Sequence, residues 1–182
     1  MTAIIVIAII VILVLWVISV QRKLVKQEEI CKNGLSQIGV QQTNRWDALK
    51  ALVELTKSYS DYEYKTMTDV IAQRRPITGG SSSADANAQE NLFTQAMSHL
   101  NVVVEKYPDL KANENFSKTM DSVNTYTNQV RMSQMVYNDS VTKFNQLIRQ
   151  FPDSIVASLF HFVPREYLQV NEQKTEMPSM AI

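Results

Sequence analysis

The chain has few of the residues that build disulfides, metal centres or tight β-turns. Among its 182 residues there are one cysteine, two histidines and four glycines. Cys31 cannot form an internal disulfide, and His99 and His161 have no second ligand at metal-binding spacing. Alternating β-branched runs joined by tight turns are also missing. The sequence therefore predicts an all-α fold.

Catalytic and nucleotide-binding patterns are likewise missing. No glycine-rich phosphate loop occurs, and Cys31 has no neighbouring histidine that could activate it. Lysine and arginine total 18 and so do aspartate and glutamate, which gives no electrostatic reason to expect nucleic acid as a partner. We expect no enzymatic activity, no cofactor and no metal ion.

The most informative segment is an apolar run over residues 3–20, AIIVIAIIVILVLWVISV, which carries no charge. As a helix it would span about 27 Å, close to the hydrocarbon thickness of a bilayer. A cleaved signal peptide would have a basic start and a small-residue cleavage site, and both are missing here. A buried core helix would need partners that are apolar all round. We expect residues 1–22 to be an uncleaved transmembrane anchor that contacts membrane lipid through residues 3–20.

The charges beside the run predict its orientation. Arg22, Lys23 and Lys26 follow it, and no basic residue precedes it. Basic residues near a span favour the cytoplasmic side, so most of the chain is expected in the cytoplasm. Trp16 suits an interfacial position at the same end of the span.

The transmembrane helix is predicted to continue into an antiparallel long-helix bundle over 23–163, which is followed by a polar C-terminal tail, 164–182. Apolar periodicity predicts three long helices, at 35–74, 88–107 and 113–150, and a short C-terminal helix at 153–162 capped by Asp153 or Ser154. Within the bundle, residues 76–87 (PITGGSSSADAN) are predicted to be a flexible linker.

The predicted helices differ in length, so their apolar stripes cannot all be buried against one another. The helix at 113–150 has a stripe in a 4-3 alternation, interrupted by the polar Thr127 and Gln134. The predicted helices span about 60, 30 and 57 Å, so they cannot cover one another end to end. Either the 153–162 helix folds back over the excess, or part of the stripe is covered by another chain. The second alternative predicts a homo-oligomer; a looser first stripe that tolerates exposure would need none.

Several polar residues lie within or beside these stripes. Arg45 and Asp47 flank Trp46, while Asn138 and Asn145 lie seven residues apart on the 113–150 helix. We expect them to be buried and to fix the helix register, since buried polar groups need partners. A small-ligand pocket lined by Arg45, Asp47 and Tyr137 is the alternative interpretation.

Between the second and third long helices lies YPDLKANENF, residues 107–116. Pro108 cannot continue the preceding helix and favours an extended Tyr107. Asn113 is predicted to cap the following helix, and Leu110 to close the end of the bundle.

In order along the chain, these blocks resemble the LemA family. The first block comprises Val40, Gln41, Arg45, Asp47, Leu52, Val53, Lys57, Tyr59 and Glu63. The second block is 107–116, and the third comprises Tyr137, Asn138, Val141, Phe144, Asn145, Phe151, Pro152, Ala157 and Phe162.

The resemblance implies a bacterial single-pass membrane protein with a long-helix bundle and no assigned enzymatic activity. Some relatives are associated with membrane organelles, which suggests membrane organisation as a role. The family more often has glutamate and arginine at the positions of Thr127 and Gln134, and it has a proline near Lys50. A function that depends on that charge pair is therefore in doubt for this chain. The structural candidates are Arg45, Asp47, Tyr59, Tyr107, Pro108, Asn113, Tyr137, Asn138, Asn145 and Pro152.

The sequence leaves more than one functional hypothesis. The first is a non-enzymatic, membrane-anchored helical scaffold that self-associates in the membrane plane and organises the membrane. The second is an adaptor or regulator of a membrane-protein partner, such as a protease or a cell-wall enzyme. An enzyme that uses Arg45, Asp47 and Tyr137 is the third.

Overall fold

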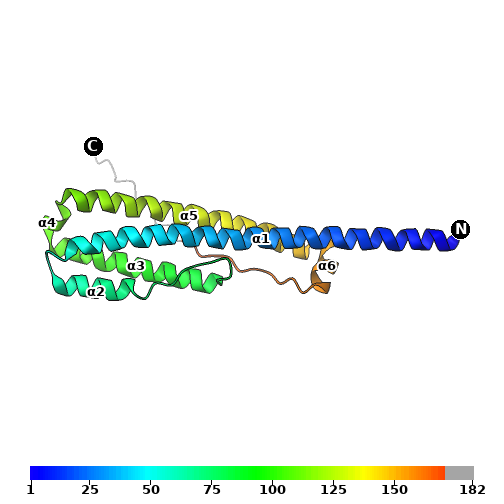
Figure 1. The fold of residues 1–182 in the computed structure, drawn as a ribbon, viewed down its shortest axis with the longest axis horizontal. Coiled ribbons are helices and arrows are strands. Elements are labelled where there is room, and N and C mark those ends of the chain that lie inside the picture. Colours follow the sequence, from blue (N-terminus) through cyan, green and yellow to red (C-terminus); the bar gives the residue numbers. More distant parts are fainter. Residues whose placement is uncertain (171–182) are drawn as a thin grey trace, which may run out of the picture.

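A long helix forms the axis of the structure, and all other elements lie along it (Figure 1). The computed structural model describes residues 1–170. Its helices are α1 (Thr2–Thr56), α2 (Asp61–Ile71), α3 (Ser83–Lys106), α4 (Pro108–Lys111), α5 (Glu114–Arg149) and α6 (Asp153–Leu159). Within these residues there is no strand, and α5 runs antiparallel beside α1 (Figure 1). The predicted all-α class and helical bundle are confirmed.

Helix α1 joins the apolar run to the bundle without a break. Its 55 residues correspond to a rod of about 80 Å. Its most apolar 18-residue window has a mean hydropathy of 3.4, and only 6% of that window is buried. A core helix would be mostly buried, so this part of α1 is a candidate membrane span. Burial of α1 in the bundle begins at Val20 and Leu24.

The first bundle helix ends earlier in the sequence than predicted. It ends at Thr56 instead of residue 74, because the chain turns at residues 57–60 and starts α2. The Ser60 hydroxyl caps α2 by accepting a hydrogen bond from the Glu63 N–H at 3.3 Å. Ser60 and Glu63 form the S-x-x-E signature of a helix start. That signature lay within an apolar stripe that continues to Met67, which is fully buried.

The segment predicted to be a flexible linker is partly helical. Helix α3 begins at Ser83, so the assignment of residues 83–87 to the linker is wrong. Ser82 and Asp85 form a capping box, in which each side chain accepts a hydrogen bond from the other residue's N–H at 3.0 Å. The Ser82 hydroxyl, which donates to the Asp85 carboxylate at 2.6 Å, and the Ser82 N–H lower the pKa of the Asp85 carboxyl. Upstream, Ile77 is buried against α1, so residues 76–82 are packed against the bundle.

The described part of the C-terminal tail is also part of the bundle. Helix α6 ends at Leu159, before residue 162, because His161 adopts a left-handed conformation with φ 58°. The Phe162 N–H then donates to the Ala157 carbonyl at 2.9 Å, which closes the helix. Its N-cap is Pro152, not Asp153 or Ser154. Beyond it an extended segment returns along α5 and buries Leu168 (Figure 1). The prediction for 171–182 lies outside the described residues.

The position of α6 helps to explain how the apolar stripe of α5 is buried. The α5 stripe residues Phe116, Val123, Val130, Tyr137, Val141, Phe144 and Ile148 are all buried within one chain. Helix α6 contributes Val156 and Ala157 to the same core. The predicted fold-back covers the end of the stripe, where Val141, Phe144 and Ile148 share the α6 core, whereas Phe116 and Val123 pack in the distal core with residues of α1 and α3. Only its last residue, Phe151, is largely exposed.

The interior consists of two apolar cores with a polar layer between them. The core nearest the candidate span contains Leu24, Leu35 and Phe144, whereas the distal core contains Trp46, Phe93 and Leu110. Between them lie the buried polar side chains of Gln42, Arg45, Gln89 and Gln134.

We predict that Gly39→Ala destabilises the bundle and that Gly34→Ala does not. A Cβ at Gly39 would lie 1.9 Å from the Ile77 carbonyl oxygen, so residues 76–82 would have to move. We expect a loss of about 1–3 kcal/mol in the free energy of unfolding, by analogy with overpacked cores. Chemical denaturation of the protein in detergent micelles measures this difference.

Gly34→Ala is the matched control, because a Cβ there would meet Tyr137 Cδ2 at an ordinary 3.4 Å. Both positions are helical, so replacing glycine by alanine favours the helix by up to about 1 kcal/mol in both variants. Equal stability of the two variants would contradict the close packing of residues 76–82 on α1.

Candidate functional site

A groove of about 660 Å³ lies between α3 and α5, with Arg45 of α1 at its base. Helix α3 supplies Phe93 and Met97, and α5 supplies Met120, Arg131 and Gln134 as the principal side chains of its walls. The other lining residues are Glu90, Thr94, Ser98, Asn101, Val123, Asn124, Thr127 and Asn128. The surface is mixed, because methionines provide adaptable apolar contacts while amides and hydroxyls provide hydrogen bonds.

Arg45 is held from two sides. Its guanidinium donates two hydrogen bonds to the Glu90 carboxylate, at 3.0 and 2.6 Å. It also lies over the Phe93 ring, with Cζ 3.8 Å from the ring centroid. The Arg45 side chain is only 1% exposed and that of Glu90 is 14% exposed, so this is a nearly desolvated ion pair. The expected burial of Arg45 is confirmed, and its partner is a residue that the sequence analysis did not single out.

The polar layer retains unused hydrogen-bonding capacity. Among the described residues, Arg45 Nε, Trp46 Nε1 and Gln42 Nε2 have no hydrogen-bond partner although they are buried. Gln42 and Trp46 line a separate cavity of about 190 Å³ beside Arg74 and Arg75. Since a water molecule can partner such donors in a cavity of this size, the layer does not by itself define a ligand site.

Asp47 and Tyr137 do not join Arg45. The Asp47 side chain is 59% exposed and pairs with Arg74 at 2.8 Å, so its predicted buried role is wrong. Tyr137 belongs to the span-proximal core and donates from its hydroxyl to the Glu166 carbonyl at 3.3 Å. A small-ligand pocket lined by these three residues is therefore not formed.

Asn138 and Asn145 bind the extended segment instead of a neighbouring helix. The Asn145 amide accepts from the Arg165 N–H and donates to the Arg165 carbonyl, both at 2.9 Å. Asn138 makes the same pair of bonds with Leu168, also at 2.9 Å. Seven helical residues rise about 10.5 Å and three extended residues about 10 Å, so the two spacings match. Asn145 is buried as predicted and Asn138 is half-buried, but both bind backbone of the extended segment, so the prediction that they fix the register between helices stays untested.

The remaining candidates are at the ends of helices. The Asn113 side chain accepts from the N–H groups of Asn115 and Phe116, which confirms the predicted cap of α5. Pro108 begins α4, and Leu110 is fully buried, as expected. Tyr59 and Tyr107 lie together at this end, with ring centroids 6.4 Å apart. Pro152 follows Phe151 through a cis peptide bond and precedes α6.

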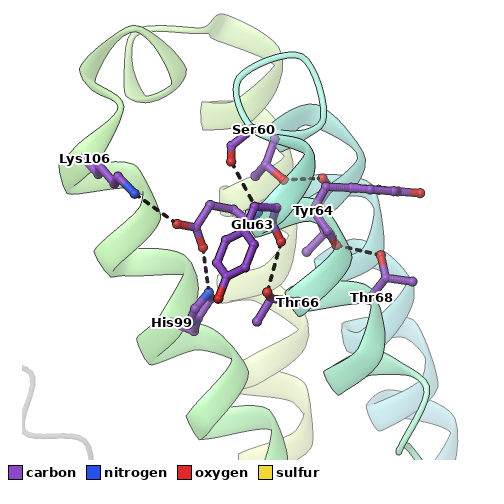
Figure 2. Close-up of polar contacts among 10 residues, drawn as sticks. Ser60, Glu63, Tyr64, Thr66, Thr68, His99 and Lys106 are labelled. Atoms are coloured by element: carbon purple, nitrogen blue, oxygen red, sulfur yellow. Dashed lines mark hydrogen bonds and ion pairs between the residues drawn. The ribbon is translucent and has the colours of Figure 1, made fainter.

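A second polar cluster joins α2 to α3 (Figure 2). The Glu63 carboxylate contacts His99 Nε2 at 3.1 Å and accepts from Lys106 Nζ at 3.3 Å. The hydrogen bond from Lys106 raises the pKa of its ammonium group. The Glu63 N–H also donates to the Ser60 hydroxyl that caps α2. Glu63 therefore takes part in the cap of α2 through its backbone and joins α2 to α3 through its side chain.

The titratable side chains of the span-proximal core are inert near neutral pH. Burial raises the pKa of the Cys31 thiol and of the Tyr137 phenol. Cys31 is fully buried, so its sulfur is shielded from acylation or attack on a substrate. Among the described residues, no group of three potential metal ligands lies together. The arrangement positions helices and offers a groove for contact.

We predict that Asn145→Ala and Asn138→Ala each release the extended segment locally. Each variant removes two hydrogen bonds to one backbone residue, at a net cost of about 1–3 kcal/mol. Hydrogen exchange should accelerate at the Arg165 amide in Asn145→Ala and at the Leu168 amide in Asn138→Ala. Asn128→Ala is the control, because Asn128 lies exposed on the same helix. Unchanged exchange at both amides would contradict the attachment of the extended segment to α5 by these two asparagines.

We predict that Glu90→Gln costs about 3 kcal/mol of stability, because it leaves the Arg45 charge buried without a counterion. The double variant Arg45→Met, Glu90→Leu should stay within about 1 kcal/mol of the parent, since apolar packing can replace a buried pair. Denaturation of the single and double variants measures both values.

The exposed Asp47–Arg74 pair provides the control for this prediction. Asp47→Asn should change stability by less than about 1 kcal/mol, because both partners contact solvent. If the double variant were as unstable as Glu90→Gln, loss of packing and not the unpaired charge would explain the effect.

The comparisons with known proteins identify a family. The model described as "LemA family" matches residues 34–181, which cover α1 from Gly34 through all later helices. No curated protein matches the chain.

Proposed function

Because the chain belongs to the LemA family and joins a candidate membrane span to its bundle in one helix, we propose that it is a membrane-anchored, non-catalytic scaffold that self-associates in the membrane plane. The continuity of α1 is the observation that carries this proposal. A rigid rod that stands on the bilayer is suited to hold contacts at a fixed distance from lipid. Arg22, Lys23 and Lys26 support a cytoplasmic bundle through the positive-inside rule.

Self-association is supported by an apolar surface outside the buried stripe. Met132, Met135 and Val136 of α5 are 59%, 46% and 55% exposed, at the spacing that places them on one helix face. Gln41 of α1 lines a surface hollow together with Met132, and the neighbouring Val40 is 58% exposed. Confinement to a membrane raises the effective concentration of this patch, so a modest affinity is sufficient for assembly.

The groove supports a second candidate, an adaptor that binds a membrane-protein partner. Phe93, Met97 and Met120 provide an apolar strip, and Arg45 Nε is an unpartnered donor at its base. A helix or extended peptide of a partner would fit this mixed surface, since such grooves bind through apolar anchors and few polar contacts.

We predict that the full-length protein in lipid nanodiscs is oligomeric and that Val136→Glu shifts it toward monomer. A buried carboxylate disfavours an apolar interface, so the association constant should fall at least about tenfold, which corresponds to about 1.4 kcal/mol. Mass photometry of the nanodiscs, prepared over a range of protein-to-lipid ratios, measures the subunit number.

Val102→Glu is the matched control, because Val102 is 62% exposed but lies on α3. A monomer at every concentration, or equal loss in both variants, would contradict the scaffold. A different membrane protein that co-purifies in a fixed ratio would instead favour the adaptor, provided that Asn124→Trp, which fills the groove, releases it.

A further inference from the structure

We propose that α6 and its flanking residues dock on the bilayer surface and form a second, interfacial membrane contact beside the candidate span. The proposed occupant of this surface is lipid. The inference rests on the membrane anchor of the proposed function. It adds a second membrane contact in a segment that lies about 130 residues further along the sequence but is joined to α1 by the Lys23–Asp153 ion pair.

The first observation is the exposure of large apolar side chains around α6. Ile155 and Leu159, one turn apart, are 56% and 65% exposed. Phe151, Phe160 and Val163 are 77%, 48% and 70% exposed. Single exposed apolar residues are ordinary on protein surfaces, but a run of five within 13 residues marks an interaction site.

The second observation is where this surface lies. Figure 1 shows α6 at the end of the bundle from which the apolar part of α1 emerges. Val156 and Ala157 pack in one core with Val20 and Leu24, and Trp16 and Val17 pack against that core. Since residues 3–20 form the apolar run, α6 lies at the level where the run ends. A bilayer around that run would reach α6 directly.

The third observation concerns charge and attachment. Lys23 pairs with Asp153 at 3.0 Å, which fixes the start of α6 to α1 just beyond the apolar run. Arg22 and Lys26 lie exposed on α1 within one turn of Lys23. Basic side chains beside an apolar surface are the combination that interfacial helices use, with apolar groups inserted about 5–10 Å below the headgroups.

Lipid fits this surface better than a protein partner does. A soluble partner would have to reach a surface pressed against the membrane, whereas lipid is already present there. Docking of α6 would also hold the bundle at two points, α1 and α6, and so restrict its tilt relative to the membrane.

The test uses nitroxide labels in the full-length protein, reconstituted at high dilution in vesicles of phosphatidylcholine and phosphatidylglycerol. The buried Cys31 is replaced by alanine, and a single cysteine is introduced by Leu159→Cys, Val102→Cys or Ile9→Cys; Val102 is 62% exposed on α3, outside the self-association patch. Power saturation measures collisions with apolar oxygen and with a water-soluble nickel complex. A label in lipid, a label in water and a label covered by protein differ in their pair of collision rates with oxygen and with the nickel complex.

We expect the Leu159 label to collide with the nickel complex roughly threefold less than the Val102 label and more with oxygen, as an interfacial depth requires. Val163→Cys serves as the second label should Leu159→Cys fail to fold, and circular dichroism verifies the helices of every variant.

Each other outcome overturns the proposal in a distinguishable way. If Leu159 is as accessible to nickel as Val102 while Ile9 is protected, α6 does not dock but the anchor stands. If Ile9 is also accessible to nickel, the anchor fails with it. If Leu159 is protected from both reagents, a protein surface covers α6 and lipid does not.

Discussion

The structure depends on one constraint, the unbroken course of α1 from the apolar run into the bundle. Both apolar cores, the polar layer and the clamped C-terminal segment are assembled on this helix or on α5, which packs along it. Gly34 and Gly39 lie inside α1 without ending it, and Gly39 is used for close approach of the Ile77 backbone. Because α1 has no proline, it lacks the commonest cause of a helix kink, and its apolar part and the bundle share one continuous helix.

The buried polar pair disfavours displacement of the helices along one another. Apolar contacts alone tolerate many neighbours of similar volume and so specify the position of one helix along another less strictly. The Arg45–Glu90 pair removes that freedom, because displacement of α3 along α1 would leave a buried charge without its counterion. The same pair forms the base of the α3–α5 groove, so the element that fixes the helices also shapes the surface between them.

The sequence predicts those features that depend on local chemistry. The apolar run, the Asn113 cap and the burial of Leu110 each follow from residues within one turn or one segment. The Ser60 cap also had a local signal, S-x-x-E, but the apolar period continues through it to Met67 and favoured one long helix. Partners were harder to predict: Glu90 looks like any surface glutamate until the position of α3 along α1 is known.

Asn138 and Asn145 mark the limit of such reasoning. Their spacing of seven indicates one face of a helix, which favours a helix as the partner. Seven helical residues also match three extended ones in length, and only tertiary structure decides between the two. The extended segment is chosen because α6 turns the chain back at His161 and the Asn145 amide receives the Arg165 backbone within four residues. The hydrogen bonds from Asn145 of α5 and the Lys23–Asp153 pair on α1 therefore hold α6 from both ends, with Val156 and Ala157 packed in the core and Ile155 and Leu159 exposed.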